Sequence, residues 1–549
     1  MATTNHYLAV TAGPIYRTLS NVRRTRELWA ASYCFTYLMK GIAKKLHNLE
    51  YKNFIIPYTN DEVFKHQKDG VGRFPDRLIF QANNPDKDKK NLENAIAETL
   101  DDFSEQVCIR LKINNETEKA NVNIFFKDYF QLYIVSKNLA EVDNPVLKIS
   151  PAIEVAELKR SFSLEAKEYL DLLLTKVTTS FLVEDAFGKT THFFDSVVEV
   201  ALREFKKDSA YLAYNNKKKN SKKFKEEQND EETLVLDIAK SNKNKFRISH
   251  KYIAIVHADG DGIGKIIEAI RDTPPGLIQN FHNFSQKLSD YSSEATKMIS
   301  RYGGMPVYAG GDDLLFFAPV YNKQSDEKDT KDIFSLLDKL NSSFKKKMGN
   351  GATLSFGLSI SYYKFPLAEA VETSRDLMFL RAKKTTEKNC ISFKVLKHSG
   401  AYFEADLRIG SETYLSFTEL LDAALRQNKD LLSSVMYRIR QNEELIRMIG
   451  NDTHALKAFF DNSFNERVHK TGVNKDFLDA VKLLIPQVFK EIQGHFFTDP
   501  FIGDQLKKNQ SKADYLSERA LYQVYALLRM TDFIARKEST SQVAQQSAT

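Results

Sequence analysis

Two short stretches of this sequence concentrate carboxylates and glycines in a pattern that could do chemistry. Residues 310–313 read Gly-Gly-Asp-Asp and lie between two apolar stretches, 307–309 and 314–318. A tight hairpin turn accounts for one glycine and one aspartate, but this segment carries two of each. The flanking stretches predict strands buried on both faces. Carboxylates at the edge of a buried sheet are costly unless a cation lies beside them, so Asp312 and Asp313 predict a metal site, with a plain turn as the alternative.

The second stretch lies upstream, where residues 259–265 read Asp-Gly-Asp-Gly-Ile-Gly-Lys after an apolar strand candidate at 253–257. Glycines permit close approach of the backbone to a ligand, and the N-terminus of a helix offers free N–H groups to phosphate. The stretch is not a P-loop, because Lys265 is not followed by Ser or Thr. Its significance comes from its pairing with the Gly-Gly-Asp-Asp hairpin.

The order of the surrounding elements would bring these two stretches together. The expected elements follow the β-α-β-β-α-β order of a ferredoxin-like fold, with strands and helices at 253–257, 281–302, the hairpin, 331–348, 354–361, 366–383 and 391–395. In that order the first strand and the hairpin are neighbours in the sheet. We therefore expect Asp259, Asp312 and Asp313 to meet at one edge.

Three carboxylates at one edge repel one another at neutral pH, and a divalent cation relieves that repulsion. Oxygen ligands without His or Cys favour Mg²⁺ or Mn²⁺. Two such ions could activate a 3′-hydroxyl and hold a triphosphate. The residues thus indicate metal-assisted chemistry on a nucleotide.

Composition narrows the class of protein. The chain has 549 residues, enough for three or four domains, and 79 basic against 72 acidic residues give a net charge of +7, compatible with an RNA or nucleotide partner. Its cysteines, Cys34, Cys108 and Cys390, are too scattered for a zinc knuckle or a disulfide framework. The start MATTNHYLAV lacks signal-peptide features, and no apolar run approaches the ~18 residues of a membrane span. We expect a soluble, cytoplasmic protein with no membrane partner.

The chain divides into five expected regions. A first α+β domain spans 1–150, with strands at 7–11, 54–58, 77–81 and 129–135 and a long helix at 16–49. A helical domain at 151–248 contains a charged stretch, 215–232, that we expect to be a mobile loop, with RNA contact through its lysines as the alternative. The second α/β domain spans 249–400, a helical domain 401–537, and a disordered tail 538–549.

Several segments taken together resemble one family. HADGDGIGK, RYGGMPVYAGGDDLLFFAPV and LSFGLSISYYKFPLAEAVETSRDLMFLRAKK resemble the large, polymerase- and cyclase-like subunit of type III CRISPR effector complexes, nearest its III-B form. GPIYRTLSNVRRTRELWAASY, residues 13–33, is similar to that family's first palm domain. The resemblance implies an α+β fold with two ferredoxin-like palm domains and helical domains between and after them. It implies a catalytic palm at 249–400 and a non-catalytic first palm, which lacks its own Gly-Gly-Asp-Asp.

The family's functional residues transfer by position. Asp259, Asp312 and Asp313 would be the catalytic ligands of two Mg²⁺ or Mn²⁺ ions. Lys383 would contact the triphosphate, with Lys384 as an alternative and a merely solvated helix lysine as the bland interpretation. The expected nucleotide-binding set is Gly260, Asp261, Gly262, Gly264, Gly310, Gly311 and Lys383.

Two departures limit the resemblance. The family often carries an N-terminal HD nuclease domain, but here the palm-like sequence begins at residue 7 and no His-Asp pair precedes it, so we do not expect DNA cleavage. The family often has a four-cysteine zinc site, which three scattered cysteines cannot build.

The implied activity is nucleotidyl transfer from ATP, in antiviral defence, when the complex recognises target RNA. The product would be a signalling nucleotide, either a cyclic oligoadenylate or an AMP conjugate of S-adenosylmethionine, which would then be a co-substrate. The implied partners are the other subunits, the guide RNA and the target RNA. One alternative is a catalytically silent scaffold. The other is a diguanylate-cyclase-like enzyme, which would have Glu-Phe after Gly-Gly-Asp, where this chain has Asp313-Leu314.

Two further patterns predict interfaces. Arg23, Arg24 and Arg26 precede Trp29 on the first long helix, and we expect them at an inter-palm or ribonucleoprotein interface, with a solvated basic face as the alternative. An apolar stripe near residue 430 indicates core, or by resemblance a docking face for small helical subunits. Truncation after residue 410 should then cost assembly more than folding of the palms. The stripe consists of Leu420, Leu421, Leu425, Leu431, Leu432 and Val435.

Overall fold

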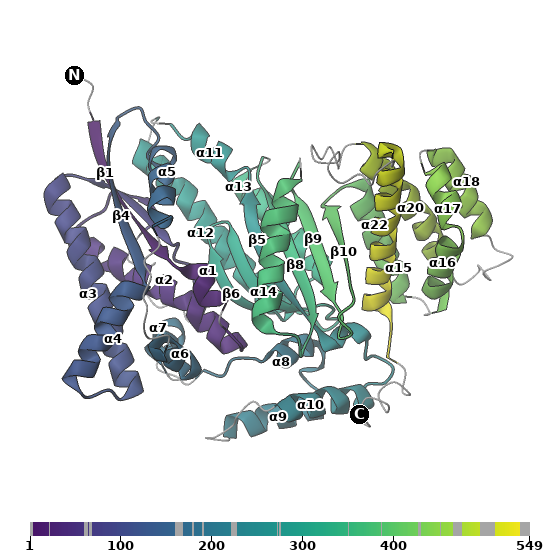
Figure 1. Ribbon diagram of the computed structural model, residues 1–549, viewed down its shortest axis with the longest axis horizontal. Helices are drawn as coiled ribbons and strands as arrows, with labels where there is room; N and C mark the ends of the chain where they lie inside the picture. Colours follow the sequence, from purple (N-terminus) through teal and green to yellow (C-terminus); the bar gives the residue numbers. More distant parts are fainter. Residues whose placement is uncertain are drawn as a thin grey trace.

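The computed structural model shows two sheet-containing domains followed by a helical end, laid out in chain order from left to right in Figure 1. The residues it describes are 4–20, 22–59, 64, 69–159, 168–177, 180–188, 192–220, 228–271, 273, 276–349, 351–385, 387–426, 430–450, 452–464, 475–494 and 511–538. Within these residues no helix is long and apolar enough to cross a membrane.

The first domain is a four-stranded antiparallel sheet with the order β2-β3-β1-β4. Its strands are β1 (Thr4–Gly13), β2 (Phe54–Ile56), β3 (Arg77–Ala82) and β4 (Gln131–Ala140). Helices α2 (Thr25–Asn48), α3 (Pro85–Leu111) and α4 (Glu116–Tyr129) form one core with the sheet. This element order and strand order are those of a ferredoxin-like fold, as predicted.

Two boundaries in this domain differ from the sequence prediction. The helix expected at 16–49 is two helices, α1 (Ile15–Leu19) and α2, because Arg24 is extended and the Thr25 hydroxyl donates to the Asp195 carbonyl at 2.6 Å, a contact far along the chain. The strand expected from residue 129 begins at Gln131, because Tyr129 ends α4.

The connecting helices join the first sheet to the second. They are α5 (Pro145–Glu157), α6 (Glu168–Thr175), α7 (Phe181–Phe187), α8 (Val197–Ala201), α9 (Ser209–Asn220) and α10 (Gln228–Ser241). Helix α5 runs across residue 150 and packs on the face of the first sheet opposite α2, in a cluster that includes Ile149 and Ile79. The domain boundaries expected from the sequence remain predictions.

The two ends of the charged stretch 215–232 are helical, where the sequence predicted a mobile loop. Residues 215–220 belong to α9 and residues 228–232 to α10, while 221–227 lie outside the described part. Apolar residues on either side of the charges, among them Tyr214 and Leu234, pack the two helices together. The physical reason is that burial of these flanking apolar side chains contributes more free energy than ordering the lysines costs in conformational entropy.

The second domain has a six-stranded sheet with the order β10-β9-β8-β5-β7-β6. Its central part, β8-β5-β7-β6, has the ferredoxin-like order that the sequence predicted. The strands are β5 (Tyr252–Asp261), β6 (Met305–Gly310), β7 (Asp313–Pro319), β8 (Thr353–Tyr362), β9 (Cys390–Leu396) and β10 (Tyr402–Arg408). The helices are α11 (Ile263–Ala269), α12 (Leu277–Tyr302), α13 (Ile333–Met348) and α14 (Leu367–Asp376).

The helix expected at 366–383 changes character before it ends. Helix α14 stops at Asp376 and continues as a π-helical turn, Leu377–Arg381, and a 3₁₀ turn, Ala382–Lys384. Such irregular turns inside helices are frequent at functional sites.

The C-terminal helices share the core of the second domain. They are α15 (Glu412–Arg426), α16 (Asp430–Gln441), α17 (Glu443–Ile449), α18 (Thr453–Ser463), α20 (Lys475–Gly494) and α22 (Lys512–Ala535). The rings of Tyr252 on β5 and Phe533 on α22 lie 4.8 Å apart, and one apolar cluster includes both. Truncation after residue 410 would expose this core, which the helices share with the second palm. That truncation costs assembly more than folding of the palms stays a prediction.

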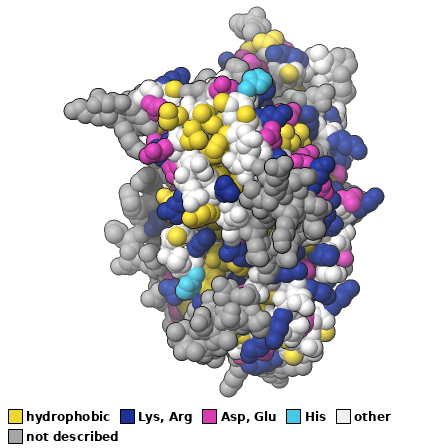
Figure 2. Space-filling model, turned by 90° about the vertical axis from the view of Figure 1, so that its right-hand side faces the viewer, with side chains coloured by type: hydrophobic (Ala, Val, Ile, Leu, Met, Phe, Trp, Pro, Cys, Tyr) yellow, Lys and Arg dark blue, Asp and Glu magenta, His cyan; other side chains and the backbone are white. Residues whose placement is uncertain are grey.

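The apolar stripe is mostly core. Leu420, Leu421, Leu432 and Val435 are buried and Leu425 is partly buried, whereas the side chain of Leu431 lies outside the described part. Figure 2 looks onto this helical end and shows hydrophobic side chains at the surface among Lys and Arg. Docking of a helical subunit there stays a prediction.

The first residue of the predicted disordered tail, Glu538, is buried in an ion pair. Glu538 forms an ion pair with Lys251 at 2.6 Å, with both side chains 7% exposed. Residues 539–549 lie outside the described part.

Candidate functional site

A cavity of about 600 Å³ lies between the two palms. Its second-palm side contains Asp259, Gly310, Gly311, Asp312 and Asp313 together with residues of α12. The first-palm side is formed by α2 and by residues 56–58 and 71–77. Cavities of this size are typical of small-molecule and cofactor sites.

The sheet register brings the predicted carboxylates together. Strand β5 pairs antiparallel with β7, with Ala258 opposite Leu314. The next residues along each strand, Asp259 and Asp313, are therefore cross-strand neighbours at the same edge. Asp312 follows Gly311, whose φ of +70° is a left-handed conformation that glycine adopts without strain. The predicted meeting of the first strand and the hairpin is observed.

The Asp312–Asp313 pair carries more negative charge than its surroundings stabilise. Burial, followed by the repulsion of Asp259, raises the pKa of Asp312 to about 6. Burial also raises the pKa of Asp313 well above its usual range, with Asp312 and Asp259 adding to the effect. Asp313 is open to the cavity, but protein atoms surround it closely, so its solvation depends on what occupies the cavity. A cation bound there would lower both pKa values.

Lys383 neutralises the other part of the cluster. Its ammonium forms an ion pair with Asp259, donates to Asp261 Oδ1 at 2.9 Å and donates to the Gly260 carbonyl at 2.6 Å. Burial would lower the pKa of Lys383, but the two carboxylates outweigh it and the pKa is raised. Lys384, the predicted alternative, is exposed. The geometry places Lys383 rather than Lys384 at the carboxylates.

Asp261 has a different position from the other carboxylates. It is buried and does not line the cavity. Its Oδ2 accepts from the Thr353 hydroxyl at 3.0 Å, the Ser355 hydroxyl at 2.8 Å and the Asn389 N–H at 3.0 Å. With Lys383 on Oδ1, both oxygens are engaged. Asp261 is thus built to fix the turn and Lys383, and its predicted contact with nucleotide stays a prediction.

The glycines of the two stretches differ in what the space around them requires. A Cβ at Gly260 would lie 2.6 Å from Asp312 Oδ2, and one at Gly310 would lie 2.0 Å from the Tyr308 hydroxyl. Gly262 has a φ of +78°, and a Cβ there would lie 2.4 Å from the Gly351 carbonyl. A Cβ at Gly264 would meet nothing within 4 Å. Three of the predicted glycines are therefore sterically required, and Gly264 is not.

The types of donor atom at this site suit a metal ion, but their arrangement is not that of a metal site. Among the described residues, no group of three or more His, Cys, Asp or Glu side chains is arranged to hold a metal ion. Asp259 already forms an ion pair with Lys383, and Asp261 accepts a hydrogen bond from Ser355 on β8. Asp259, Asp312 and Asp313 nevertheless supply only carboxylate oxygens, the ligands that Mg²⁺ and Mn²⁺ prefer, and two of them have raised pKa values. We conclude that the donor set suits these ions.

Sequence reasoning missed the first-palm side of the cavity. Asp76 lines it, and burial raises the pKa of this carboxyl despite the neighbouring Arg77. Arg73 and Lys40 also line it and are paired with Asp69 and Asp185. The signal available was RFPDR at 73–77, a charged turn next to the β3 sequence. It has no spacing that marks it as a site, so only the tertiary structure reveals it.

The arginines at the start of α2 do not line the cavity. Arg23 is exposed, and Arg24 and Arg26 are half-buried. Trp29 is buried, and its indole N–H donates to the Gly70 carbonyl at 2.5 Å. The tryptophan therefore holds the loop that precedes the cavity residues 71–77, and an interface role for the arginines stays a prediction.

Comparison with known proteins follows the same division of the chain. Residues 252–392 match the second palm domain of Cas10/Cmr2, and residues 7–109 match the N-terminal region of the CRISPR-associated protein Cmr2. The CRISPR system Cmr subunit Cmr2 of Pyrococcus furiosus is 25% identical over 306 residues, which are 50% of this chain and 32% of that protein. The chain thus matches about a third of the length of this curated relative.

A solved structure supports the fold. A chain of the type III-B Cmr-beta assembly in its apo state is similar with a TM-score of 0.53 and 10% identity, over 96% of this chain and 82% of that chain. At this identity the likeness establishes the architecture alone.

Proposed function

On the premise that this chain is a relative of the Cas10/Cmr2 large subunit, we propose that it is a nucleotidyltransferase that joins nucleotides from ATP. The observation that carries the proposal is the cavity between the palms, with Asp259, Asp312 and Asp313 on one side. Its volume of about 600 Å³ suits a nucleotide substrate.

The chemistry is attack of a 3′-hydroxyl on the α-phosphate of ATP. The new P–O bond forms as the bond to pyrophosphate breaks, and the hydroxyl proton is released. Mg²⁺ or Mn²⁺ ions held by Asp259, Asp312 and Asp313 would neutralise charge and lower the pKa of the hydroxyl. Gly310 and Gly311 let the substrate approach the carboxylates. Lys383 supplies a positive charge for the triphosphate, because its ammonium already lies beside Asp259.

The proposed setting is a type III CRISPR complex in the cytoplasm, with target RNA recognition as the trigger. The chain would assemble with the other subunits and, through them, with guide and target RNA. The product would be a signalling nucleotide, either a cyclic oligoadenylate or an AMP conjugate of S-adenosylmethionine.

The test is reconstitution of the complex with cognate RNA, labelled ATP and Mg²⁺, with and without S-adenosylmethionine. Mass spectrometry identifies the product. An ATP-derived oligonucleotide or an adenylated S-adenosylmethionine that depends on target RNA supports the proposal. Absence of any new phosphodiester product in both mixtures overturns it, and a product from GTP alone would favour the diguanylate-cyclase-like alternative.

A silent scaffold is the second candidate, and two observations favour it. Asp259 already forms an ion pair with Lys383. Among the described residues, no three His, Cys, Asp or Glu side chains are arranged to hold a metal ion. A scaffold would bind neither Mn²⁺ nor ATP in the cavity. Equilibrium binding of both to the purified complex separates the two candidates independently of turnover.

A further inference from the structure

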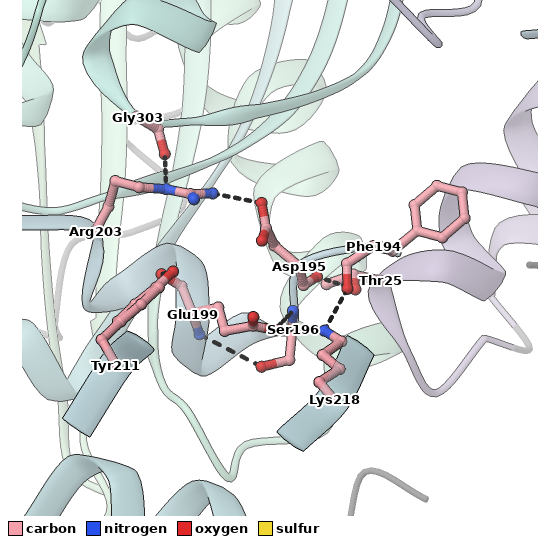
Figure 3. Close-up of polar contacts among 9 residues, drawn as sticks. All are labelled: Thr25, Phe194, Asp195, Ser196, Glu199, Arg203, Tyr211, Lys218 and Gly303. Carbon is pink, nitrogen blue, oxygen red and sulfur yellow. Dashed lines mark hydrogen bonds and ion pairs between the residues drawn. The ribbon is translucent and has the colours of Figure 1, made fainter. Parts of the chain in front are cut away.

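A polar cluster lies in the segment of connecting helices α8 and α9, which we call the connector. It links the two palms at a distance from the cavity. We call Asp195, Glu199, Arg203 and Lys218 the clasp; Figure 3 shows these side chains and their contacts. Arg203 Nη2 donates to Asp195 Oδ2 at 2.5 Å, and Lys218 donates to Glu199 Oε2 at 2.6 Å. The clasp lies on the segment that leads from the first palm through α8 to α9.

The clasp contacts both palms directly. On one side, the Thr25 hydroxyl at the start of α2 donates to the Asp195 carbonyl at 2.6 Å. On the other side, Arg203 Nε donates to the Gly303 carbonyl at 3.1 Å, at the end of α12. A Cβ at Gly303 would lie 2.5 Å from Arg203 Cγ, so the arginine stem packs closely on that turn. One guanidinium therefore bridges the connector and the second palm.

The clasp is built to be rigid. The side chains of Glu199 and Lys218 are 2% and 7% exposed. Glu199 also accepts from the Ser196 N–H at 2.8 Å, and Lys218 also donates to the Phe194 carbonyl at 2.6 Å. A buried ion pair is costly unless such additional hydrogen bonds satisfy it, and a fully satisfied network holds one arrangement.

Two routes lead from the clasp to the cavity. The Phe194 ring lies 4.8 Å from that of Trp29, whose indole N–H holds the Gly70 carbonyl. The same loop then accepts the Ala309 N–H on the Gly72 carbonyl at 2.9 Å. The first route thus ends at the cavity residues 71–77 and at β6.

The second route runs through the second palm. Gly303 is followed by β6, which ends at Gly310, and only Gly311 separates it from the two aspartates of the hairpin. Helix α12, which Gly303 terminates, lines the cavity with Ser285 and Leu288. Both sides of the cavity are therefore connected to the clasp by short, packed segments.

We propose that Arg203 is a positioning residue that fixes the separation of the two palm surfaces across the nucleotide cavity. The inference rests on the proposed function for its kinetic consequence and on the contacts above for its structural one. Arg203 touches no cavity atom, so it acts through Gly303 and Asp195. Nucleotide affinity then depends on the connector as well as on the cavity residues.

The experiment uses the reconstituted complex with the full chain carrying Arg203→Met, Arg203→Lys or a control, Arg301→Met. Arg203 is the right target because its partner Asp195 is partly exposed, whereas removing Glu199 or Lys218 alone would leave a buried charge. Arg301 lies in the last turn of α12 and pairs with Glu327 at 2.5 Å, but that pair lies within the second palm.

We expect Arg203→Met to raise the KM for ATP on the order of tenfold. Loss of folded molecules would lower apparent kcat and leave KM unchanged, so KM separates positioning from a merely structural effect. We also expect faster hydrogen exchange at the Ala309 amide, whose N–H donates to the Gly72 carbonyl. Exchange at Ile255, in the centre of β5, should be unchanged. Arg203→Lys should restore part of both effects, and Arg301→Met should produce neither.

Unchanged KM together with unchanged exchange at Ala309 in Arg203→Met would overturn the inference, as would equal effects from Arg301→Met. The exchange measurement needs no turnover. If the wild-type complex makes no nucleotide product, the proposed function fails, while the exchange measurement still decides whether Arg203 couples the palms.

Discussion

The four strands of the first palm and the central four of the second have the same order, yet the connection equivalent to the second palm's Gly-Gly-Asp-Asp turn is entirely different in the first. In the second palm β6 and β7 are joined by a tight turn at Gly311 and Asp312. In the first, β2 ends at Ile56 and β3 begins at Arg77. Part of that long connection, 71–77, lies across the cavity from the second palm's carboxylates.

This difference assigns the two domains distinct positions at one site. The short turn presents Asp312 and Asp313 beside Asp259 of β5, with little room around them, because Cβ atoms at Gly260 and Gly310 would clash. The long connection instead reaches the second palm and pairs with it, through the Ala309 N–H and the Gly72 carbonyl. One topology thus provides the carboxylate side of the cavity in one copy and the opposing side in the other.

The largest expected effect is loss of the second palm's carboxylates. Asp312→Asn with Asp313→Asn keeps side-chain size and turn propensity but removes the charge that cations need. Nucleotide synthesis should fall about a hundredfold or more, ~3 kcal/mol of transition-state stabilisation. Unfolding of the metal-free chain should require equal or slightly more free energy, because the mutual repulsion is gone. Product formation and chemical denaturation measure the two.

Assembly and RNA binding by this double variant are the controls and should persist. Asp259→Asn combined with Asp312→Asn should be far less than additive, since the residues act as one site. Near wild-type synthesis by the double Asn variant would mean that the hairpin is only a turn.

A smaller loss is expected from crowding the same side. Gly260→Ala places a methyl group 2.6 Å from Asp312 Oδ2, so the carboxylate must shift. Overpacking of this kind costs roughly 1–3 kcal/mol, and we expect about a tenfold loss of synthesis with the fold retained. Gly351→Ala is the matched control, because a Cβ there meets nothing within 4 Å. Equal activity of the two variants would contradict the close packing of Gly260 on Asp312.

The first palm's Asp76 should have a weaker and different effect. Asp76→Asn should change the KM for ATP about threefold, because it alters only the opposing side of the cavity. The raised pKa of Asp76 means that the folded state binds its proton more tightly than the unfolded chain does. Its ionisation therefore lowers stability as pH rises through the unfolded value of ~3.9, and Asn should remove that cost at pH 7.

Denaturation of this variant and the wild type at pH 3 and pH 7 tests the sign. The stabilisation should be present at pH 7 and shrink towards pH 3. Arg77 opposes the shift and Glu157 adds to it, so the pair Arg77–Glu157 must be intact in both proteins. A loss of synthesis as large as that of the Asp312/Asp313 variant would erase the distinction between the palms.

The smallest effect should come from an exposed contact between the palms. The Arg375 guanidinium on α14 lies 4.8 Å from the centre of the Tyr16 ring on α1. Tyr16 is half exposed, so this cation–π contact contributes roughly 0.5–1 kcal/mol. Tyr16→Leu should lower the unfolding free energy by that amount and change synthesis less than about twofold. A double-mutant cycle with Arg375→Met isolates the contact, and a coupling energy of zero would rule it out.

The sequence by itself determined the arrangement of the second palm's carboxylates. Apolar strand stretches, a β-α-β-β-α-β order and a tight Gly-Gly-Asp-Asp turn are local signals, and together they require Asp259 and Asp313 to be cross-strand neighbours. The observed neighbour relation and the ferredoxin-like strand orders follow from positions that the sequence marks, whereas Lys383 was indicated only by the family resemblance.

Only the tertiary structure decided what surrounds those carboxylates and how the rest of the chain packs. Asp76 faces the cavity because two domains pack together, Asp261 is engaged by Thr353 and Ser355 on β8, and the helix at 16–49 is interrupted where Thr25 contacts Asp195. Lys218, inside a charged stretch that looked solvated, is buried against Glu199. Each of these depends on a partner outside its own local segment, and local spacing carries no information about contacts whose energy comes from burial and pairing between separate segments.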